Sequence, residues 1–416
     1  MTTTTTTSQP SARHRFALAA TSFAFFVTMM GTTLPTPLYT LYAEKLAFQP
    51  LTVTVLFAVY AAGVVAALAL FGRMSDQVGR RPVLLIAIML SGLSAVAFVL
   101  STSLPLLIAA RVISGLSAGL MSGTGTAAVI DLFPAKQRKT AGTLAVAANT
   151  GGLAFGTIFA GVIADYAPAP LMVPYLAHLA LTLVASAALV SCTPRSSGSG
   201  RWHAVRPQKL TVPHEIRTDF LRAVLSGGAA FATIGVLTAV GALFLSRNLH
   251  LASHSLAGFL VFLAFAGMAV GQLAARRLAP TTAMFLGCLG LTSSSAILAI
   301  AIGLTHVAPL LIASALLGIS GGACMNAGLA TTVERTEPAL RGAVSSSYFT
   351  GLYAMLAIPA IGVGLLTSVS NLTTAGLTFS VGVAILALAT AILELLTRSR
   401  HSAGLEPSAN AEQTTL

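Results

Sequence analysis

A short island of charged residues separates two long apolar runs near the start of the chain. It reads GRMSDQVGRRPVL and sets a carboxylate, Asp76, four and five residues before the guanidinium groups of Arg80 and Arg81. This spacing is short enough for a local ion pair between Asp76 and Arg80. Gly72 and Gly79 let the backbone turn without a Cβ penalty. These residues, which we name the charged turn, therefore predict a tight, ion-paired loop at a membrane face.

Arg111 is the second residue with distinctive chemistry, because it lies inside an apolar run, about two turns after Pro105. A guanidinium group at such a position costs several kcal/mol unless it meets water or a partner. Arg111 either lies in or beside a central cavity, where it contacts substrate or tunes a proton site, or extends to the outer headgroups.

Other polar side chains within apolar runs are candidates for contact with a substrate or a coupling ion. For each of them a hydrogen bond between helices is as good an interpretation as substrate contact. The candidates are Thr33, Tyr39, Asn149, Asn326 and Tyr353.

Catalytic and cofactor patterns are absent from the sequence. Cys192, Cys288 and Cys324 are scattered and have no metal or disulfide spacing. No Walker loop, dinucleotide fingerprint or zinc pattern is found. We therefore expect no enzyme activity, no metal and no cofactor.

Composition defines the broad class. Of the 416 residues, 55% are hydrophobic and 8% charged, and the mean hydropathy is +0.86. Soluble domains carry about 25% charged residues, so this chain is predicted to be an integral membrane protein. Its apolar runs are solid rather than alternating, which favours helices over barrel strands. At about 20 residues a span, twelve are predicted: 16–42, 51–71, 82–101, 105–132, 140–164, 170–191, 220–245, 256–275, 282–304, 307–333, 343–367 and 372–396.

The basic residues predict the orientation. With the N-terminus in the cytoplasm, 20 of the 23 lysines and arginines fall on the cytoplasmic side. Outside are only Lys45 and Arg247, and Arg111 lies within a run. This distribution follows the positive-inside rule. The net charge of +12 is thus a topology signal and not a sign of nucleic-acid binding. We expect a multi-pass protein of a bacterial inner membrane with both termini cytoplasmic.

The same runs predict the domain organisation. A cytoplasmic arm, 1–15, precedes a six-helix half, 16–192. A polar linker, 193–219, rich in Ser, Gly, Pro and Arg, leads to a second six-helix half, 220–397, and a cytoplasmic tail, 398–416.

The charged turn resembles the signature G-x-L-A-D-R-x-G-R-R-x-x-L of the major facilitator superfamily. Met74, Ser75 and Gln77 depart from the family's Leu, Ala and Arg. The residues that match are Gly72, Asp76, Gly79, Arg80, Arg81 and Leu84.

Two further motifs resemble the same family. Arg111, Gly115 and Gly119 fit the pattern R-x-x-x-G-x-x-x-G. A weaker match to the antiporter motif G-x-x-x-G-P-x-x-G-G has Thr157 in place of proline and Ala160 in place of a glycine, and small residues spaced by four also allow plain helix packing. The glycines that match this antiporter motif are Gly152, Gly156 and Gly161.

The two halves also repeat. Gly115 and Gly119 recur 203 residues later as Gly318 and Gly322. At the same offset Asp131 falls on Glu334. The resemblance implies an all-α membrane fold of twelve transmembrane helices in two pseudo-symmetric halves, with a site between them.

The resemblance further implies a secondary transporter that works by alternating access. In it the charged turn and Asp131 would form a cytoplasmic gate. It also places the helix that carries His178 at the periphery, where we expect a structural role.

Our first functional expectation is the drug:proton antiporter branch, with efflux of a small lipophilic or amphipathic compound. An uptake symporter or uniporter for a small metabolite is the alternative, and a transporter-like sensor or a channel is the alternative of another class. No carboxylate is predicted near the bilayer midplane, so Asp131 becomes the candidate proton carrier. We expect a small-molecule substrate, protons and membrane lipids as partners, and no nucleic acid. We also expect the protein to be a monomer.

Overall fold

The computed structural model describes residues 12–72, 74–193, 210–337 and 340–403. Most of the predicted arm, linker and tail, as well as Arg73, lies outside them. Every regular element in the described part is helical: α1 Ala12–Thr33, α2 Tyr39–Leu46, α3 Pro50–Phe71, α4 Met74–Val78, α5 Arg80–Val99, α6 Leu104–Asp131, η1 Ala135–Gln137, α7 Arg138–Tyr166, α8 Val173–Cys192, η3 His214–Ile216, α9 Arg217–Arg247, α10 His254–Ala275, α11 Pro280–Leu304, α12 Val307–Glu334, α13 Arg341–Val369 and α14 Leu372–Ala403.

Twelve helices in this part of the chain, α1, α3 and α5 to α14, are long and apolar enough to cross a bilayer. A helix pairs its own backbone N–H and C=O groups by hydrogen bonds, and lipid offers these groups no other partner. The predicted all-helical membrane fold with twelve spans is therefore confirmed. α9 begins at Arg217, three residues before the predicted span, because η3 leads directly into it.

The first predicted span, 16–42, is not one helix. α1 ends at Thr33 and the short α2 begins at Tyr39. Pro35 has no N–H to donate to the carbonyl of Gly31, and the N–H of Thr36 bonds the carbonyl of Thr33 at 3.0 Å. The helical hydrogen-bond ladder therefore stops here.

The chain packs into two compact units whose segments alternate along the sequence. Unit 1 comprises 1–48, 59–209 and 254–262, and unit 2 comprises 49–58, 210–253 and 263–416.

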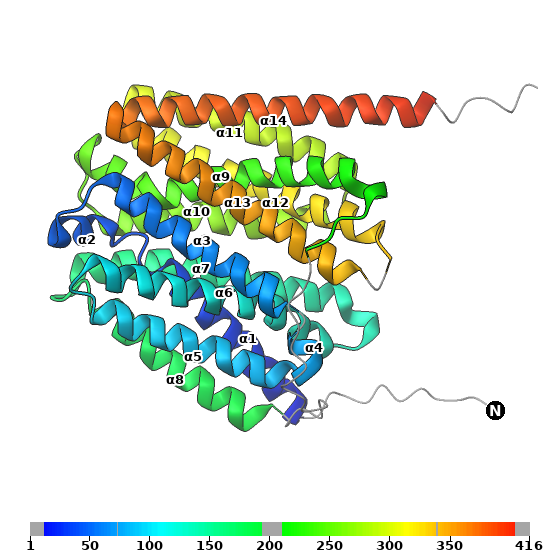
Figure 1. Ribbon diagram of the computed structural model, residues 1–416, viewed down its shortest axis with the longest axis horizontal. Coiled ribbons are helices and arrows are strands. Elements are labelled where there is room, and N and C mark those ends of the chain that lie inside the picture. Colours follow the sequence, from blue (N-terminus) through cyan, green and yellow to red (C-terminus); the bar gives the residue numbers. More distant parts are fainter. Residues whose placement is uncertain (1–11, 73, 194–209, 338–339, 404–416) are drawn as a thin grey trace, which may run out of the picture. The chain divides into compact units, whose positions relative to one another are not determined.

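In unit 1, α5 lies between α6 and α8, and α1 packs against α6, α7 and α8 (Figure 1). Phe25 and Met29 of α1, Leu84 and Ile88 of α5 and Met121 of α6 belong to its buried core. In unit 2, α9 is buried along most of its length and packs against α12 and α13, while α11 packs against α12 and α14.

Glycines bring helix backbones together in the same way in both units. A Cβ added at Gly115 of α6 would overlap the carbonyl oxygen of Tyr60 in α3. A Cβ added at Gly318 of α12 would overlap the carbonyl oxygen of Ala264 in α10. Between helices in lipid, close packing of this kind replaces the hydrophobic effect as the source of stability. The repeat read from the sequence thus corresponds to a repeated helix contact.

Candidate functional site

The charged turn lies in unit 1, where α4 leads into α5. Arg80 donates through Nη1 to Asp76 Oδ1 at 2.5 Å and to Ser75 Oγ at 2.6 Å, and through Nε to Asp131 Oδ2 at 3.0 Å. It therefore ties the turn to the end of α6. The side chains of Asp76 and Asp131 are 60% and 59% exposed. Solvated ion pairs of this kind contribute about 0.2–1 kcal/mol each, so they can break in a conformational change.

The backbone of the charged turn depends on Gly79. Its φ of 96° and ψ of 159° lie in a region that side chains disfavour, and it immediately precedes α5. At the other side of the turn, Gly72 donates its N–H to the carbonyl of Leu68 at 3.2 Å and closes α3. Arg81 donates to the carbonyl of Val190, at the end of α8, at 2.7 Å.

Arg111 is enclosed in unit 1, with 1% of its surface exposed. Its guanidinium group lies over three aromatic rings, 5.1 Å from the centroid of Tyr39, 5.7 Å from Tyr60 and 5.6 Å from Phe98. It also donates hydrogen bonds to the hydroxyl of Tyr39 and, at 3.0 Å, to the carbonyl of Thr32. No carboxylate pairs with it among the described residues.

The break after α1 explains the hydrogen bond from Arg111. In a continuous helix the carbonyl of Thr32 would accept the N–H of Thr36, which here bonds the carbonyl of Thr33. Arg111 satisfies the carbonyl that is left over, and a buried carbonyl without a partner would cost about 1–3 kcal/mol. The aromatic faces offset part of the cost of burying the charge. In this structure the side chain of Arg111 is enclosed by these contacts and does not extend to the surface.

The structure brings some of the predicted site residues together. Arg111 and Tyr39 are in direct contact, and Thr33 follows the residue whose carbonyl Arg111 binds. The hydroxyl of Thr33 donates to the carbonyl of Leu153 in α7 at 2.8 Å. Asn149, one turn earlier in α7, is half-buried, and its Oδ1 has no hydrogen-bond partner in the described part of the chain.

The two remaining candidates lie in unit 2. Asn326 is half-buried in α12. Tyr353 lies in α13, with its ring edge-on to Phe231 of α9 at a centroid distance of 5.8 Å.

The predicted packing glycines face three different neighbours. Gly115 and Gly119 of α6 lie against the backbone of α3. Gly152 and Gly156 of α7 lie against the backbone of α1, near Met30. Gly161 lies instead against the first turn of α10.

His178 is 1% exposed, and its Nε2 lies 3.0 Å from the hydroxyl of Ser91 in α5. A side chain on Gly31 of α1 would overlap its imidazole ring. The residue thus fastens α8 to α5 and α1.

Sequence reasoning missed two clusters, because periodicity does not show which distant positions meet. Asp165, at the end of α7, bonds the first turn of α10 through His254. In unit 2, the sulfur atoms of Cys288 and Cys324 lie 3.9 Å apart, although 36 residues separate them along the chain. Near them Glu394 is 7% exposed.

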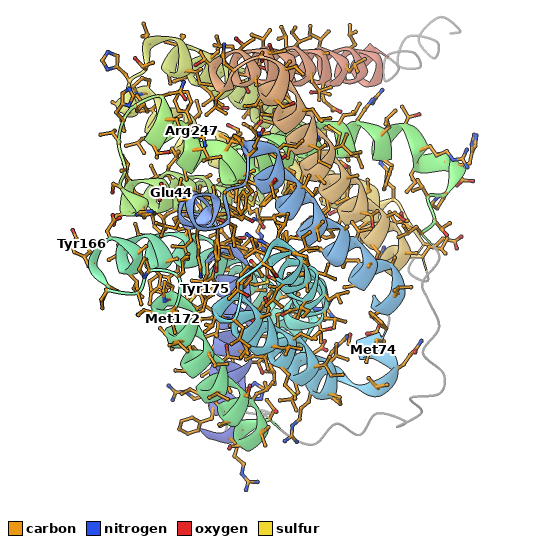
Figure 2. The ribbon with its side chains drawn as sticks, turned by 60° about the vertical axis from the view of Figure 1, so that its left-hand side comes forward. Glu44, Met74, Tyr166, Met172, Tyr175 and Arg247 are labelled. Atoms are coloured by element: carbon orange, nitrogen blue, oxygen red, sulfur yellow. The ribbon has the colours of Figure 1, made fainter. Side chains whose placement is uncertain are left out.

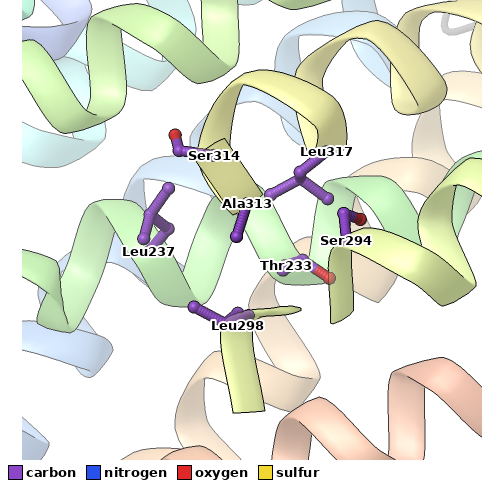
Figure 3. A pocket seen from close by; sticks show the side chains of 7 residues that line it. All are labelled: Thr233, Leu237, Ser294, Leu298, Ala313, Ser314 and Leu317. Atoms are coloured by element: carbon purple, nitrogen blue, oxygen red, sulfur yellow. The ribbon is translucent and has the colours of Figure 1, made fainter. Parts of the chain in front are cut away.

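A small pocket in unit 2 is lined by residues of α9, α11 and α12 (Figure 3). The hydroxyls of Thr233 and Ser294 donate to carbonyls of their own helices, at 2.9 and 3.0 Å. The lining is therefore mostly apolar in character. It consists of Thr233, Leu237, Ser294, Leu298, Ala313, Ser314 and Leu317.

Proteins similar to the chain include several named for multidrug resistance. It is 28% identical over 153 residues to putative multidrug resistance protein MdtD of Cronobacter sakazakii, which covers 37% of this chain and 32% of that protein. The match to the protein of the same name from Salmonella typhimurium is also 28% identical over 153 residues and covers 37% of this chain and 33% of the relative. The chain therefore matches about a third of the length of these relatives.

Solved transporters share the fold. A bacterial homologue of the human lysosomal transporter Spinster, in an inward-facing and occupied conformation, superposes with a TM-score of 0.69 at 13% identity, over 94% of this chain and 98% of that one. A mutant of the nucleoside transporter NupG superposes with a TM-score of 0.68 at 12% identity, over 90% of this chain and 98% of that one. Residues 21–360 match the sequence profile of the Major Facilitator Superfamily. With twelve spans, the charged turn and this match over most of its length, the chain belongs to the Major Facilitator Superfamily of membrane transporters.

Proposed function

We propose that this transporter exports small lipophilic or amphipathic compounds by alternating access, in exchange for protons. It would do so from a bacterial inner membrane, with both termini in the cytoplasm. The partial similarity to proteins named for multidrug resistance supports this direction and substrate class.

The observation that carries the proposal is the scarcity of buried charge. Among the described residues, Arg111 and Glu394 are the only Asp, Glu, Lys or Arg side chains that are buried. A polyanion or a sugar phosphate needs several cationic or hydrogen-bonding groups to replace its water. Hydroxyls, amides and aromatic rings with few charges suit a lipophilic or amphipathic compound better.

Arg111 has a defined part in this proposal. It holds the broken end of α1 through the Thr32 carbonyl and the Tyr39 hydroxyl, and thus keeps two helical segments in a fixed relation. A substrate that displaces α1 or α2 would change the surroundings of this charge. The site would then couple binding to helix movement.

The test uses cells that lack their own export pumps and express the chain. Fluorescent lipophilic cations and neutral dyes are added, and their steady-state accumulation is measured against cells that express Arg111→Ala at matched abundance. Export predicts lower accumulation that rises again when an uncoupler collapses the proton gradient. Higher accumulation would favour the uptake alternative, and no change with any compound would contradict the proposal.

A further inference from the structure

Asp165 makes an unusual set of contacts at the end of α7. Its Oδ1 accepts the backbone N–H of His254 at 2.9 Å and the ring Nδ1 of the same residue at 2.8 Å. Its Oδ2 accepts the backbone N–H of Ser255 at 2.8 Å. One carboxylate from α7 therefore receives three hydrogen bonds from the first turn of α10.

These bonds have a clear physical basis. The first N–H groups of a helix have no partner within the helix, and its N-terminus favours negative charge. Hydrogen bonds to an ionised acceptor are also about twice as strong as neutral ones. The side chains of Asp165 and His254 are only 20% and 19% exposed, so water competes weakly for this contact.

The helix backbones meet directly beside the carboxylate. A Cβ added at Gly161 of α7 would overlap the carbonyl oxygen of His254, and one added at Gly258 of α10 would overlap the carbonyl oxygen of Thr157. Two glycines, one from each helix, thus allow α7 and α10 to touch over about one turn. The first nine residues of α10, 254–262, consequently belong to unit 1, and the rest of the helix belongs to unit 2.

This contact lies at the far end of unit 1 from the charged turn. α7 begins at Arg138 and ends at Tyr166, a length of about 40 Å at 1.5 Å per residue. Figure 2 shows Tyr166, the neighbour of Asp165, and Met74 of α4 at opposite ends of the molecule's first unit.

We propose that Asp165 and the first turn of α10 form a latch that closes the transporter at the end opposite the charged turn and is released in each cycle. This inference rests on the alternating access proposed above. Release would break three hydrogen bonds that depend on a single carboxylate. The freed N–H groups would then donate hydrogen bonds to water instead. Asp165 is then a positioning residue that sets the balance between two conformations, rather than a static cap.

The first experiment measures whether the latch controls exposure of the α7–α10 contact. Thr157 is fully buried at this contact, so Thr157→Cys is the reporter, in a background with Cys192, Cys288 and Cys324 replaced. The purified protein is placed in nanodiscs, where both faces are accessible, and its reaction with a maleimide is timed. We expect Asp165→Ala to raise the rate at least threefold.

Asp165→Asn should give an intermediate rate, since the amide has one acceptor oxygen and no charge. Tyr166→Ala is the matched control, because the neighbouring Tyr166 side chain is 84% exposed and makes no part of the latch. Equal rates in the parent, Asp165→Ala and Tyr166→Ala would reduce Asp165 to a static cap and overturn the proposal.

A second measurement covers the case in which Asp165→Ala is poorly folded. Spin labels at Tyr166 and Leu251 report the distance between the end of α7 and the segment that leads into α10, and Asp165→Asn should add a population at longer distance. Labels at Tyr166 and Met172, both in unit 1, should show the same distance in parent and variant. An unchanged distribution for the first pair would overturn the latch. Neither readout depends on substrate, direction or coupling ion, so a failed export assay would leave them interpretable.

Discussion

At the scale of the residue, Arg111 shows how a membrane protein buries a positive charge without a carboxylate. Three ring faces lie within 6 Å of its guanidinium group, and two oxygens accept hydrogen bonds from it. Cation–π contacts contribute about 0.5–1 kcal/mol each at exposed sites and about 2 kcal/mol or more when the groups are desolvated. The charge is thus held by a set of contacts that only a planar, multiply donating group makes at once.

We expect both Arg111→Lys and Arg111→Ala to abolish transport nearly completely. Lysine keeps the charge but loses the planar fork of donors, so it cannot stack on the rings and bind both oxygens together. Arg111→Ala should also lower membrane abundance, because it leaves the Thr32 carbonyl without a partner. The measurement is transport normalised to protein amount, with Arg247→Ala, an exposed arginine at the end of α9, as the control. Full activity of Arg111→Lys would show that charge alone is sufficient.

At the scale of the element, glycines determine where two helices pack closely, because they have no side chain between the backbones. Gly115→Ala should destabilise the protein, because the new Cβ would overlap the carbonyl of Tyr60 and push α6 away from α3. Gly123→Ala in the same helix is the matched control, since nothing lies within 4 Å of its Cβ position. Alanine there should be neutral or stabilising by up to about 1 kcal/mol from helix propensity. Thermal unfolding in detergent distinguishes the two, and equal midpoints would contradict the packing role of Gly115.

The charged turn gives a second prediction at this scale. The resemblance implies that the charged turn is part of a cytoplasmic gate, so Asp76→Asn should shift the population inward and reduce transport. The ion pair it weakens is exposed and contributes at most about 1 kcal/mol, so membrane abundance should not change. Glu44→Gln, an exposed acidic residue in α2, is the control. Normal turnover in Asp76→Asn would leave the turn with a role in topology only.

The elements were largely predictable from the sequence, and their contacts were not. Apolar runs and turn residues predicted the twelve spans, because these signals are local. The spacing of Asp76 and Arg80 predicted their ion pair for the same reason. Nothing local connects Asp165 with His254, 89 residues away, or Cys288 with Cys324, 36 residues away. Such pairs depend on which helix faces meet, and a single sequence does not contain that information in a local pattern.

At the scale of the whole molecule, the distribution of basic residues predicts the orientation. Single cysteines at Ser199 and Ser402 should be shielded from an impermeant thiol reagent in intact cells. Both positions are on the side predicted to carry 20 of the 23 lysines and arginines, which the positive-inside rule assigns to the cytoplasm. Ser199 lies outside the described residues, and Ser402 lies near the end of the α14 backbone. Leu251→Cys, between α9 and α10, should be labelled from outside and serves as the control. Labelling of Ser199→Cys or Ser402→Cys would contradict this topology.

The energy source is the last property at this scale. Coupling to protons needs a group that gains and loses a proton while it is exposed to each side in turn. Asp131 meets this requirement on one side, since it is accessible at the end of α6 and its bond to Arg80 can break. We expect substrate-induced pH change in proteoliposomes with the parent and none with Asp131→Asn, because an amide cannot carry the proton. Glu394→Gln is the informative comparison, because Glu394 is a buried carboxylate in a membrane helix, a usual position for a proton relay. Flux that survives in Asp131→Asn but not in Glu394→Gln would transfer the role to Glu394, and no flux in the parent would indicate facilitated diffusion or exchange.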